Sequence, residues 1–259
     1  MRVALVHGFT QTARSWAPIG ALLEAAGHEV VTPDVAGHGS AAGIRADLVT
    51  DARRLADAIG PAVWVGYSLG GRTCLHLALE RRALVQALVL VSTTAGIDDA
   101  GERAARRAAD GALAATVESD GVERFIEQWL SGPMWATLPR AAAGVEARLA
   151  NTAEGLAASL RLAGTGTQAP LWERLAEITV PTLVVTGTRD ARFSAIGDRL
   201  AEGIGVAAAR VTFPTGHAVP WEQPQAFAAA VLDWLAAIPA PASRPPASEP
   251  AAIQGPARR

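Results

Sequence analysis

The chain of 259 residues has no lysine, a single cysteine and few charged side chains. Its 23 basic residues are all arginines and its formal net charge is −2, so it lacks the basic excess typical of nucleic-acid binding. Cys74 alone cannot form an intrachain disulfide or a multi-cysteine zinc framework. The first apolar run, Val3 to Val6, is too short for a signal peptide or a membrane span. We expect a cytoplasmic protein without membrane insertion or nucleic-acid binding, whose partner is a small molecule.

Short β-rich runs alternate along the chain with longer segments in which apolar residues recur at helical spacing. Several runs, such as Leu88 to Val91, are continuously apolar, which is typical of parallel strands covered on both faces. The pattern predicts an α/β fold with a mostly parallel sheet of about six strands and helices on both faces. The expected strands are Val3 to Val6, Glu29 to Thr32, Ala62 to Val65, Ala87 to Val91, Thr182 to Thr186 and Arg210 to Phe213.

The strand pattern stops after Gly96 and resumes at Val180, and the intervening sequence favours helices. We therefore predict a core formed by residues 1–96 and 178–237, with a helical cap inserted at 97–177. An insertion over the carboxyl ends of parallel strands lies where such sheets bind ligands. Residues 238–259 are rich in proline and alanine, and this composition predicts a disordered tail.

The segment Gly66-Tyr67-Ser68-Leu69-Gly70-Gly71-Arg72 lies between a predicted strand and a predicted helix. In this context Gly-x-Ser-x-Gly is typical of a nucleophile elbow, in which the glycines allow close backbone approach and the serine hydroxyl is exposed above the sheet. Without that context the match would indicate only a glycine-rich turn. The elbow makes Ser68 the candidate reactive side chain.

A serine at an elbow needs a histidine to take its proton and an acid to orient that histidine. Asp190 follows the strand ending at Thr186, and His217 follows the strand ending at Phe213, so the chain order is Ser, Asp, His. Both residues could instead be ordinary loop residues. Three other acids are less favoured than Asp190, because of chain order or position: Asp34, Asp198 and Asp233.

His7-Gly8-Phe9 ends the first strand, and Leu69 directly follows Ser68. We expect the backbone N–H groups of Phe9 and Leu69 to form an oxyanion hole, which can stabilise a developing negative charge by several kcal/mol. Together these features indicate an α/β-hydrolase fold. A serine at the elbow argues against epoxide hydrolases and haloalkane dehalogenases, which use a carboxylate nucleophile.

From Met1 to about Trp234 the sequence resembles one family of this fold, the 2-succinyl-6-hydroxy-2,4-cyclohexadiene-1-carboxylate (SHCHC) synthases of menaquinone biosynthesis. The elbow is shared with many hydrolases, whereas the cap motifs are more restricted. The motifs that carry the resemblance are His7-Gly8-Phe9-Thr10 with Trp16, the elbow through Arg72, Glu102-Arg103 with Arg106, Arg107 and Asp110, and Gly155 to Arg161 leading to Gly164-Thr165-Gly166-Thr167-Gln168 and Leu171-Trp172.

The resemblance implies a carbon–oxygen lyase that eliminates pyruvate from a polycarboxylate, with Ser68 as the base and no cofactor or metal. Guanidinium groups bind carboxylates in forked geometry, which suits such a substrate. Arg103 and Arg107 compete with Arg106 for one carboxylate-binding role. The implied substrate-binding residues are Tyr67, Arg72, Arg106, Trp129 and Arg161.

Two other functions are compatible with the same residues. A serine carboxylesterase or carbon–carbon bond hydrolase would use Ser68 as a covalent nucleophile, and an acyl-serine intermediate would distinguish it. A non-catalytic ligand receptor of the same fold would use the cavity only for binding. An intact Ser-Asp-His series favours an enzyme over a receptor.

Overall fold

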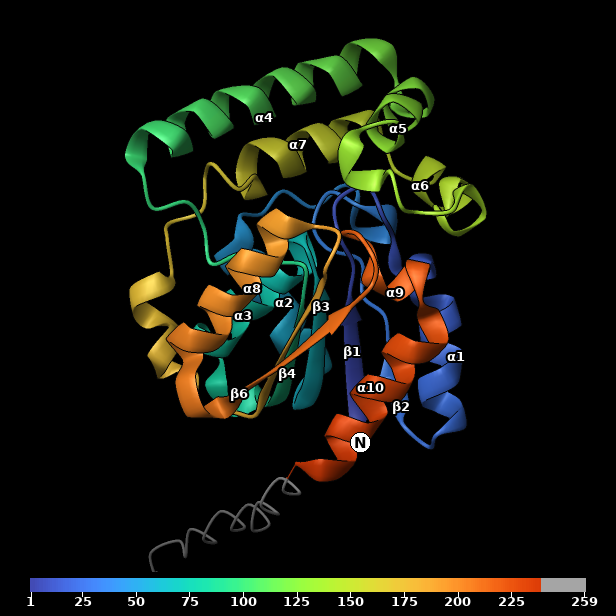
Figure 1. The fold of residues 1–259 in the computed structure, drawn as a ribbon. Helices are drawn as coiled ribbons and strands as arrows, with labels where there is room; N and C mark the ends of the chain where they lie inside the picture. Colours follow the sequence, from blue (N-terminus) through green and yellow to red (C-terminus); the bar gives the residue numbers. More distant parts are fainter. Residues whose placement is uncertain (239–259) are drawn as a thin grey trace, which may run out of the picture.

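The computed structural model describes residues 1–238 and contains one six-stranded, all-parallel sheet (Figure 1). The sheet order is β2-β1-β3-β4-β5-β6. This confirms the predicted six-stranded α/β architecture. Five observed strands extend the expected ones by one or two residues, and β2 ends one residue earlier than expected. Their bounds are β1 Arg2–Val6, β2 Glu29–Val31, β3 Ala62–Tyr67, β4 Val85–Val91, β5 Thr182–Gly187 and β6 Ala208–Phe213.

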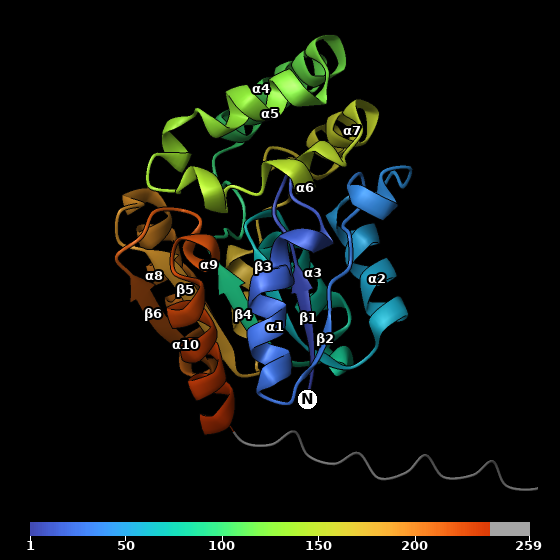
Figure 2. The same ribbon diagram turned by 90° about the vertical axis from the view of Figure 1, so that its right-hand side faces the viewer.

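Helices cover both faces of the sheet (Figure 2). One apolar cluster joins the sheet to α2, α3 and α8, and a second joins its other face to α1 and α10. The helices of these layers are α1 Ala17–Ala25, α2 Leu48–Ile59, α3 Leu69–Glu80, α8 Ala191–Ile204 and α10 Pro224–Ala237, with the short α9 at Val219–Glu222. The 3₁₀ turns are η1 Ala13–Trp16, η2 Gly39–Ala41, η3 Arg82–Leu84, η4 Pro133–Trp135, η5 Arg140–Ala142, η6 Trp172–Glu177 and η7 Gly205–Ala207.

Four helices lie together above the carboxyl ends of the strands, where the inserted cap was expected (Figures 1 and 2). They have an apolar cluster of their own, which includes Val117, Phe125 and Leu156. Leu171 and Leu175, which the sequence assigned to the cap, instead pack in the cluster between the sheet and helices α2, α3 and α8. The cap helices are α4 Ala100–Asp120, α5 Val122–Leu130, α6 Val145–Leu149 and α7 Ala153–Ala163.

The central strand β3 carries the elbow, and its six residues are all buried. The turn after it depends on two glycines. A side chain at Gly66 would collide with the backbone of Gly70 and Gly71, and one at Gly70 would collide with the carbonyl of Val6. Because both positions lack a Cβ, α3 can begin directly against β1 and β3.

The predicted disordered tail, 238–259, lies outside the described residues except for Ile238, where α10 ends. Among residues 1–238, no helix is both long and apolar enough to cross a lipid bilayer.

Candidate active site

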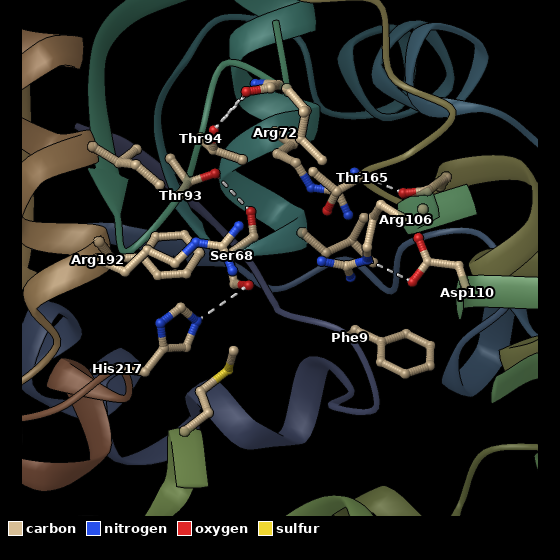
Figure 3. A pocket seen from close by; sticks show the side chains of 18 of the residues that line it. Phe9, Ser68, Arg72, Thr93, Thr94, Arg106, Asp110, Thr165, Arg192 and His217 are labelled. Carbon is tan, nitrogen blue, oxygen red and sulfur yellow. Dashed lines mark hydrogen bonds and ion pairs between the residues drawn. The ribbon is translucent and has the colours of Figure 1, made fainter. Parts of the chain in front are cut away.

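Ser68 lies between β3 and α3 with φ 51° and ψ −108°, a backbone conformation that non-glycine residues rarely adopt. Its N–H donates to the Val91 carbonyl at 2.9 Å, and its carbonyl accepts from the Thr93 hydroxyl at 2.8 Å. These bonds to β4 and to the loop after it hold the strained residue. The hydroxyl consequently points into a cavity between the core and the cap (Figure 3).

The structure brings Asp190 and His217 to Ser68 from the loops after β5 and β6. His217 Nδ1 lies 2.8 Å from Asp190 Oδ2, and its Nε2 lies 3.4 Å from Ser68 Oγ. Asp190 also begins α8, where its Oδ1 accepts the Phe193 N–H at 3.1 Å. Partial burial opposes ionisation of Asp190, but the hydrogen bonds from His217 and Phe193 outweigh it and lower the pKa of the carboxyl. The acid therefore stays ionised and can orient the imidazole.

The competing acids do not reach His217. The Asp34 carboxylate accepts the Ala13 and Ser40 N–H groups at 2.7 and 2.8 Å. Asp198 pairs with Arg210, and Asp233 is exposed on α10.

Aromatic rings surround the imidazole, which is 1% exposed. The ring centroid of Phe193 lies 4.5 Å from that of His217, and those of Tyr67 and Trp135 lie at 5.5 and 5.8 Å. Such packing excludes water and strengthens the electrostatic interactions of His217 with its polar neighbours.

Glu222 holds the loop that carries His217, and sequence reasoning missed it. Its carboxylate accepts the Gly216 N–H at 2.9 and 3.1 Å and the Ala218 N–H at 3.2 Å. It thus binds the backbone on both sides of His217. The only signal in the sequence was a glutamate five residues after the histidine, at the end of a short helix.

The two expected oxyanion donors flank the same cavity. Phe9 and Leu69 both line it, and neither backbone N–H donates a hydrogen bond within residues 1–238. The Phe9 loop is held at the next residue, Thr10, which has φ 68° and donates its N–H to His38 Nε2 at 3.2 Å. A free pair of N–H groups beside a serine hydroxyl can stabilise an oxyanion.

His38 must be neutral to hold this loop. Its Nε2 accepts the Thr10 N–H, so its Nδ1, 3.1 Å from the Ala36 carbonyl, is the protonated nitrogen. Burial, followed by the nearby His7, lowers the pKa of His38 to about 3. The imidazole therefore keeps one acceptor at ordinary pH.

The cavity measures about 360 Å³ and is lined from both the core and the cap. Tyr67 and Trp129 line it as expected, and the buried Tyr67 hydroxyl has no partner within residues 1–238. The Trp129 ring contacts Phe9, with centroids 5.3 Å apart. The Trp129 indole N–H is likewise buried without a partner among these residues, so the two side chains offer two hydrogen-bond donors and an apolar wall to a ligand.

Arg72 and Arg106 face the cavity. Arg72 is 8% exposed and donates to the Ala163 carbonyl at 2.7 Å. Burial, followed by the charge of Arg106, lowers its pKa to about 9, so it remains charged at neutral pH. Arg106 donates to Asp110 Oδ1 at 2.9 Å. The Asp110 Oδ2 atom is buried without a partner among the described residues.

The alternatives to Arg106 do not line the cavity. Arg103 donates to the carbonyls of Ile97 and Asp98, and Arg107 donates to that of Gly166. Of these three arginines, Arg106 is therefore the one that lines the cavity.

The structure does not bring Arg161 to the site. Its guanidinium forms two 2.6 Å bonds with Glu118 on the outer side of the cap, and its side chain is 45% exposed. The motif placed it correctly on α7 but could not give the direction in which it points.

Three further arginines near the site escaped the sequence analysis. Arg148 is 1% exposed, donates to the Thr10 hydroxyl and to the Ala143 carbonyl, and lies 5.6 Å from the Trp135 ring centroid. Its burial lowers its pKa to about 10. Arg192 and Arg199 line the cavity from α8. The available signal for Arg148 was its place shortly before α7, near the polar residue Asn151 and the N-cap residue Thr152.

Within residues 1–238 there is no group of three or more histidine, cysteine or acidic side chains that could hold a metal ion. The reactive groups of the described site are a hydrogen-bonded serine, two backbone donors and several guanidinium groups.

The fold and this site define the class of the protein. Residues 3–230 match the Alpha/beta hydrolase family, to which the chain belongs. Within that family it belongs with the SHCHC synthases. A 2-succinyl-6-hydroxy-2,4-cyclohexadiene-1-carboxylate synthase of Salmonella typhimurium (strain LT2) is 30% identical over 244 residues, covering 91% of this chain and 92% of the relative. A Bacillus subtilis (strain 168) protein given the same name provisionally is 32% identical over 250 residues, with coverage of 91% and 90%.

Solved structures of this fold are similar to the protein over most of its length. The structure of MenH from S. aureus matches with a TM-score of 0.84 at 28% identity, covering 91% of this chain and 93% of that one. A malate-bound thermophilic esterase from Thermogutta terrifontis matches with a TM-score of 0.77 at 25% identity, with coverage of 91% and 89%.

Removing the Glu222 carboxylate should lower the reactivity of the Ser68 hydroxyl, because the loop that carries His217 loses its support. We expect Glu222→Ala to slow labelling of Ser68 by a fluorophosphonate about tenfold, with Glu222→Gln between it and wild type, because an amide keeps only one acceptor oxygen. The exposed Glu202 on α8 provides the control Glu202→Ala. Labelling rates equal to wild type in a folded Glu222→Ala protein would contradict this positioning role.

His38 should make stability fall with acid. The unfolded chain binds a proton at His38 below about pH 6.5, whereas the folded protein does so only near pH 3. Stability should therefore decline as pH falls between these values, by at most about 1.4 kcal/mol per pH unit from this group. Urea unfolding at pH 7, 6 and 5 should give a shallower decline for His38→Gln, whose amide is neutral. Parallel curves for the two proteins would show that His38 is not responsible.

Proposed function

We propose that this protein eliminates pyruvate from 2-succinyl-5-enolpyruvyl-6-hydroxy-3-cyclohexene-1-carboxylate to give SHCHC, a step of menaquinone biosynthesis. The names of its relatives, which it matches over nine-tenths of its length, support this reaction. The observation that carries it is the buried Arg72, one helical turn after Ser68 and lining the same cavity. A fixed cation beside the serine suits a carboxylate-bearing substrate. Because that substrate is a soluble anion, we propose a cytoplasmic location.

The reaction begins at the ring C2–H, whose proton is acidified by the neighbouring succinyl carbonyl. Ser68 Oγ takes this proton and gives its own to His217 Nε2. The released electron pair forms C2=C3, the ring double bond moves to C4=C5, and the C5–O bond breaks. The departing enolate of pyruvate takes the proton from His217 and tautomerises to pyruvate. Atoms and charge balance without water or a covalent intermediate.

Asp190 and the backbone donors stabilise the charges that this step creates. Asp190 holds the imidazole in the tautomer that accepts the serine proton and stabilises the imidazolium that results. The Phe9 and Leu69 N–H groups stabilise the negative charge that develops on the succinyl carbonyl oxygen. Each stabilisation is larger in the transition state than in the ground state, and this difference accelerates the reaction.

Arg72 and Arg106 bind substrate carboxylates on the cap side of Ser68, and the Tyr67 hydroxyl donates a further hydrogen bond. Trp129 forms an apolar wall against the ring of the substrate. Asp110 holds Arg106 in place through their 2.9 Å hydrogen bond.

The same triad could cleave an ester, and the fold neighbour from Thermogutta terrifontis is an esterase. Ester hydrolysis forms an acyl-serine, whereas the elimination does not. A trapped acyl group on Ser68 with a simple aryl ester, together with no release of pyruvate, would favour the esterase.

Pyruvate release tests the proposed reaction. With precursor freshly made by the preceding enzyme, we expect Ser68→Ala and Asp190→Asn to lower kcat about 10²- to 10⁴-fold. The first variant lacks the base, and the second lacks the carboxylate that orients His217. Asp198→Asn, at the exposed acid on α8, serves as the control. If wild-type protein does not accelerate the spontaneous reaction, the synthase function is refuted.

Carboxylate binding should depend on Arg106 and not on Arg161. Arg106→Ala should raise KM about tenfold, the lower end of what a charge-assisted hydrogen bond contributes, because the guanidinium is partly exposed. Arg161→Ala should stay within about twofold of wild type, since this residue binds Glu118 instead of facing the cavity. A larger effect from Arg161 than from Arg106 would reverse the assignment.

A further inference from the structure

Arg192 is one of two cavity arginines, with Arg199, to which the mechanism assigns no role. It lies in the first turn of α8, two residues after Asp190. Its side chain extends from that helix toward Ser68 (Figure 3). It lines the main cavity and also a smaller adjoining hollow of about 230 Å³ on the Asp190 side. Arg192 therefore lies at the boundary between the two.

The other guanidinium groups of the cavity already have partners. Arg72 donates to the Ala163 carbonyl, Arg106 pairs with Asp110, and Arg199 pairs with Asp98 at 2.5 Å. Within residues 1–238, no hydrogen bond or ion pair involves the side chain of Arg192. Its fork of donors is therefore available to an anion from outside the chain.

The Phe193 ring contacts the side chains of both Arg192 and His217. Its guanidinium carbon lies 5.9 Å from the Phe193 ring centroid, and the Phe193 ring packs edge-on against His217 at 4.5 Å. Figure 3 shows Arg192 and Arg106 on different sides of Ser68. The cavity thus has cations on both sides of the serine hydroxyl.

We propose that Arg192 binds a second carboxylate of the ligand on the His217 side of Ser68, while Arg72 and Arg106 bind one on the cap side. The site then selects molecules that carry carboxylates on both sides of the atom presented to Ser68. Besides Asp110, which pairs with Arg106, three acidic side chains line the cavity, and they repel anions from the positions nearest to them: Asp98, Asp99 and Glu102. The identity of the ligand rests on the proposed function, whereas the two-sided carboxylate requirement does not.

Calorimetric titration without turnover tests the proposal. The probes are 2-succinylbenzoate, a ring with a carboxylate beside a succinyl group, and its monomethyl ester at the succinyl carboxylate and at the ring carboxylate in turn. We expect Arg192→Ala to raise the Kd of the dicarboxylate about tenfold, or about 1.4 kcal/mol, with Arg192→Lys retaining part of the affinity. The loss should be within about twofold for the monoester that lacks the carboxylate bound by Arg192.

Arg189→Ala is the matched control, because Arg189 is an exposed arginine three residues before Arg192, in the loop after β5, and lines only the smaller hollow. It should change the Kd of the dicarboxylate by less than about twofold. An equal loss in Arg189→Ala would show a general charge effect and overturn the proposal. So would unchanged dicarboxylate binding in Arg192→Ala, or an equal loss for the dicarboxylate and both monoesters.

The outcomes separate this inference from the proposed reaction. If wild-type protein binds the dicarboxylate in an Arg192-dependent manner but releases no pyruvate from the enolpyruvyl precursor, the proposed reaction is refuted and the carboxylate assignment stands. If pyruvate is released and Arg192→Ala leaves both the Kd of the dicarboxylate and the KM of the precursor unchanged, the assignment is refuted and the reaction stands.

Discussion

The close contact between the elbow and the first strand is the constraint on which the site depends. Because Gly66 and Gly70 have no side chains, α3 starts against the Val6 carbonyl, and Ser68 is held at φ 51° between them. The same contact brings the loop after β1, with the Phe9 N–H, beside the first turn of α3. One packing requirement in the backbone thus sets the relative positions of the hydroxyl and both expected oxyanion donors, before any side chain of the cap contributes.

The arginines around the cavity are restrained in different ways, and these restraints set their electrostatics. Arg72 loses solvent and lies near Arg106, which lowers its pKa to about 9 but leaves it charged. A carboxylate placed between the two would relieve their mutual repulsion as well as form hydrogen bonds. The chain has no lysine, so every cationic side chain that lines the cavity is a guanidinium. Partners therefore distinguish one guanidinium from another: a carbonyl, a carboxylate or an aromatic ring.

The sequence was sufficient for the sheet and for the meeting of Ser68, Asp190 and His217, because loops at the carboxyl ends of parallel strands converge on one edge. It was insufficient in the cap. A motif placed Arg161 on the right helix, but the direction of a side chain depends on how that helix packs, and Arg161 binds Glu118 outside. Arg148 and Arg192 were missed since every basic residue is an arginine and none stands out. Glu222 binds backbone N–H groups, and that contact depends on a loop conformation that sequence spacing does not reveal.

The 2.7 Å bond from Arg72 to the Ala163 carbonyl joins the helix of the elbow to the last residue of α7. The guanidinium to which the proposed function assigns a substrate carboxylate therefore also connects the core to the cap. Arg72 also lines the cavity, so under that proposal a bound anion would be held by the same planar group that contacts the cap. Ligand binding and this contact between core and cap would then be thermodynamically linked, because both depend on one guanidinium.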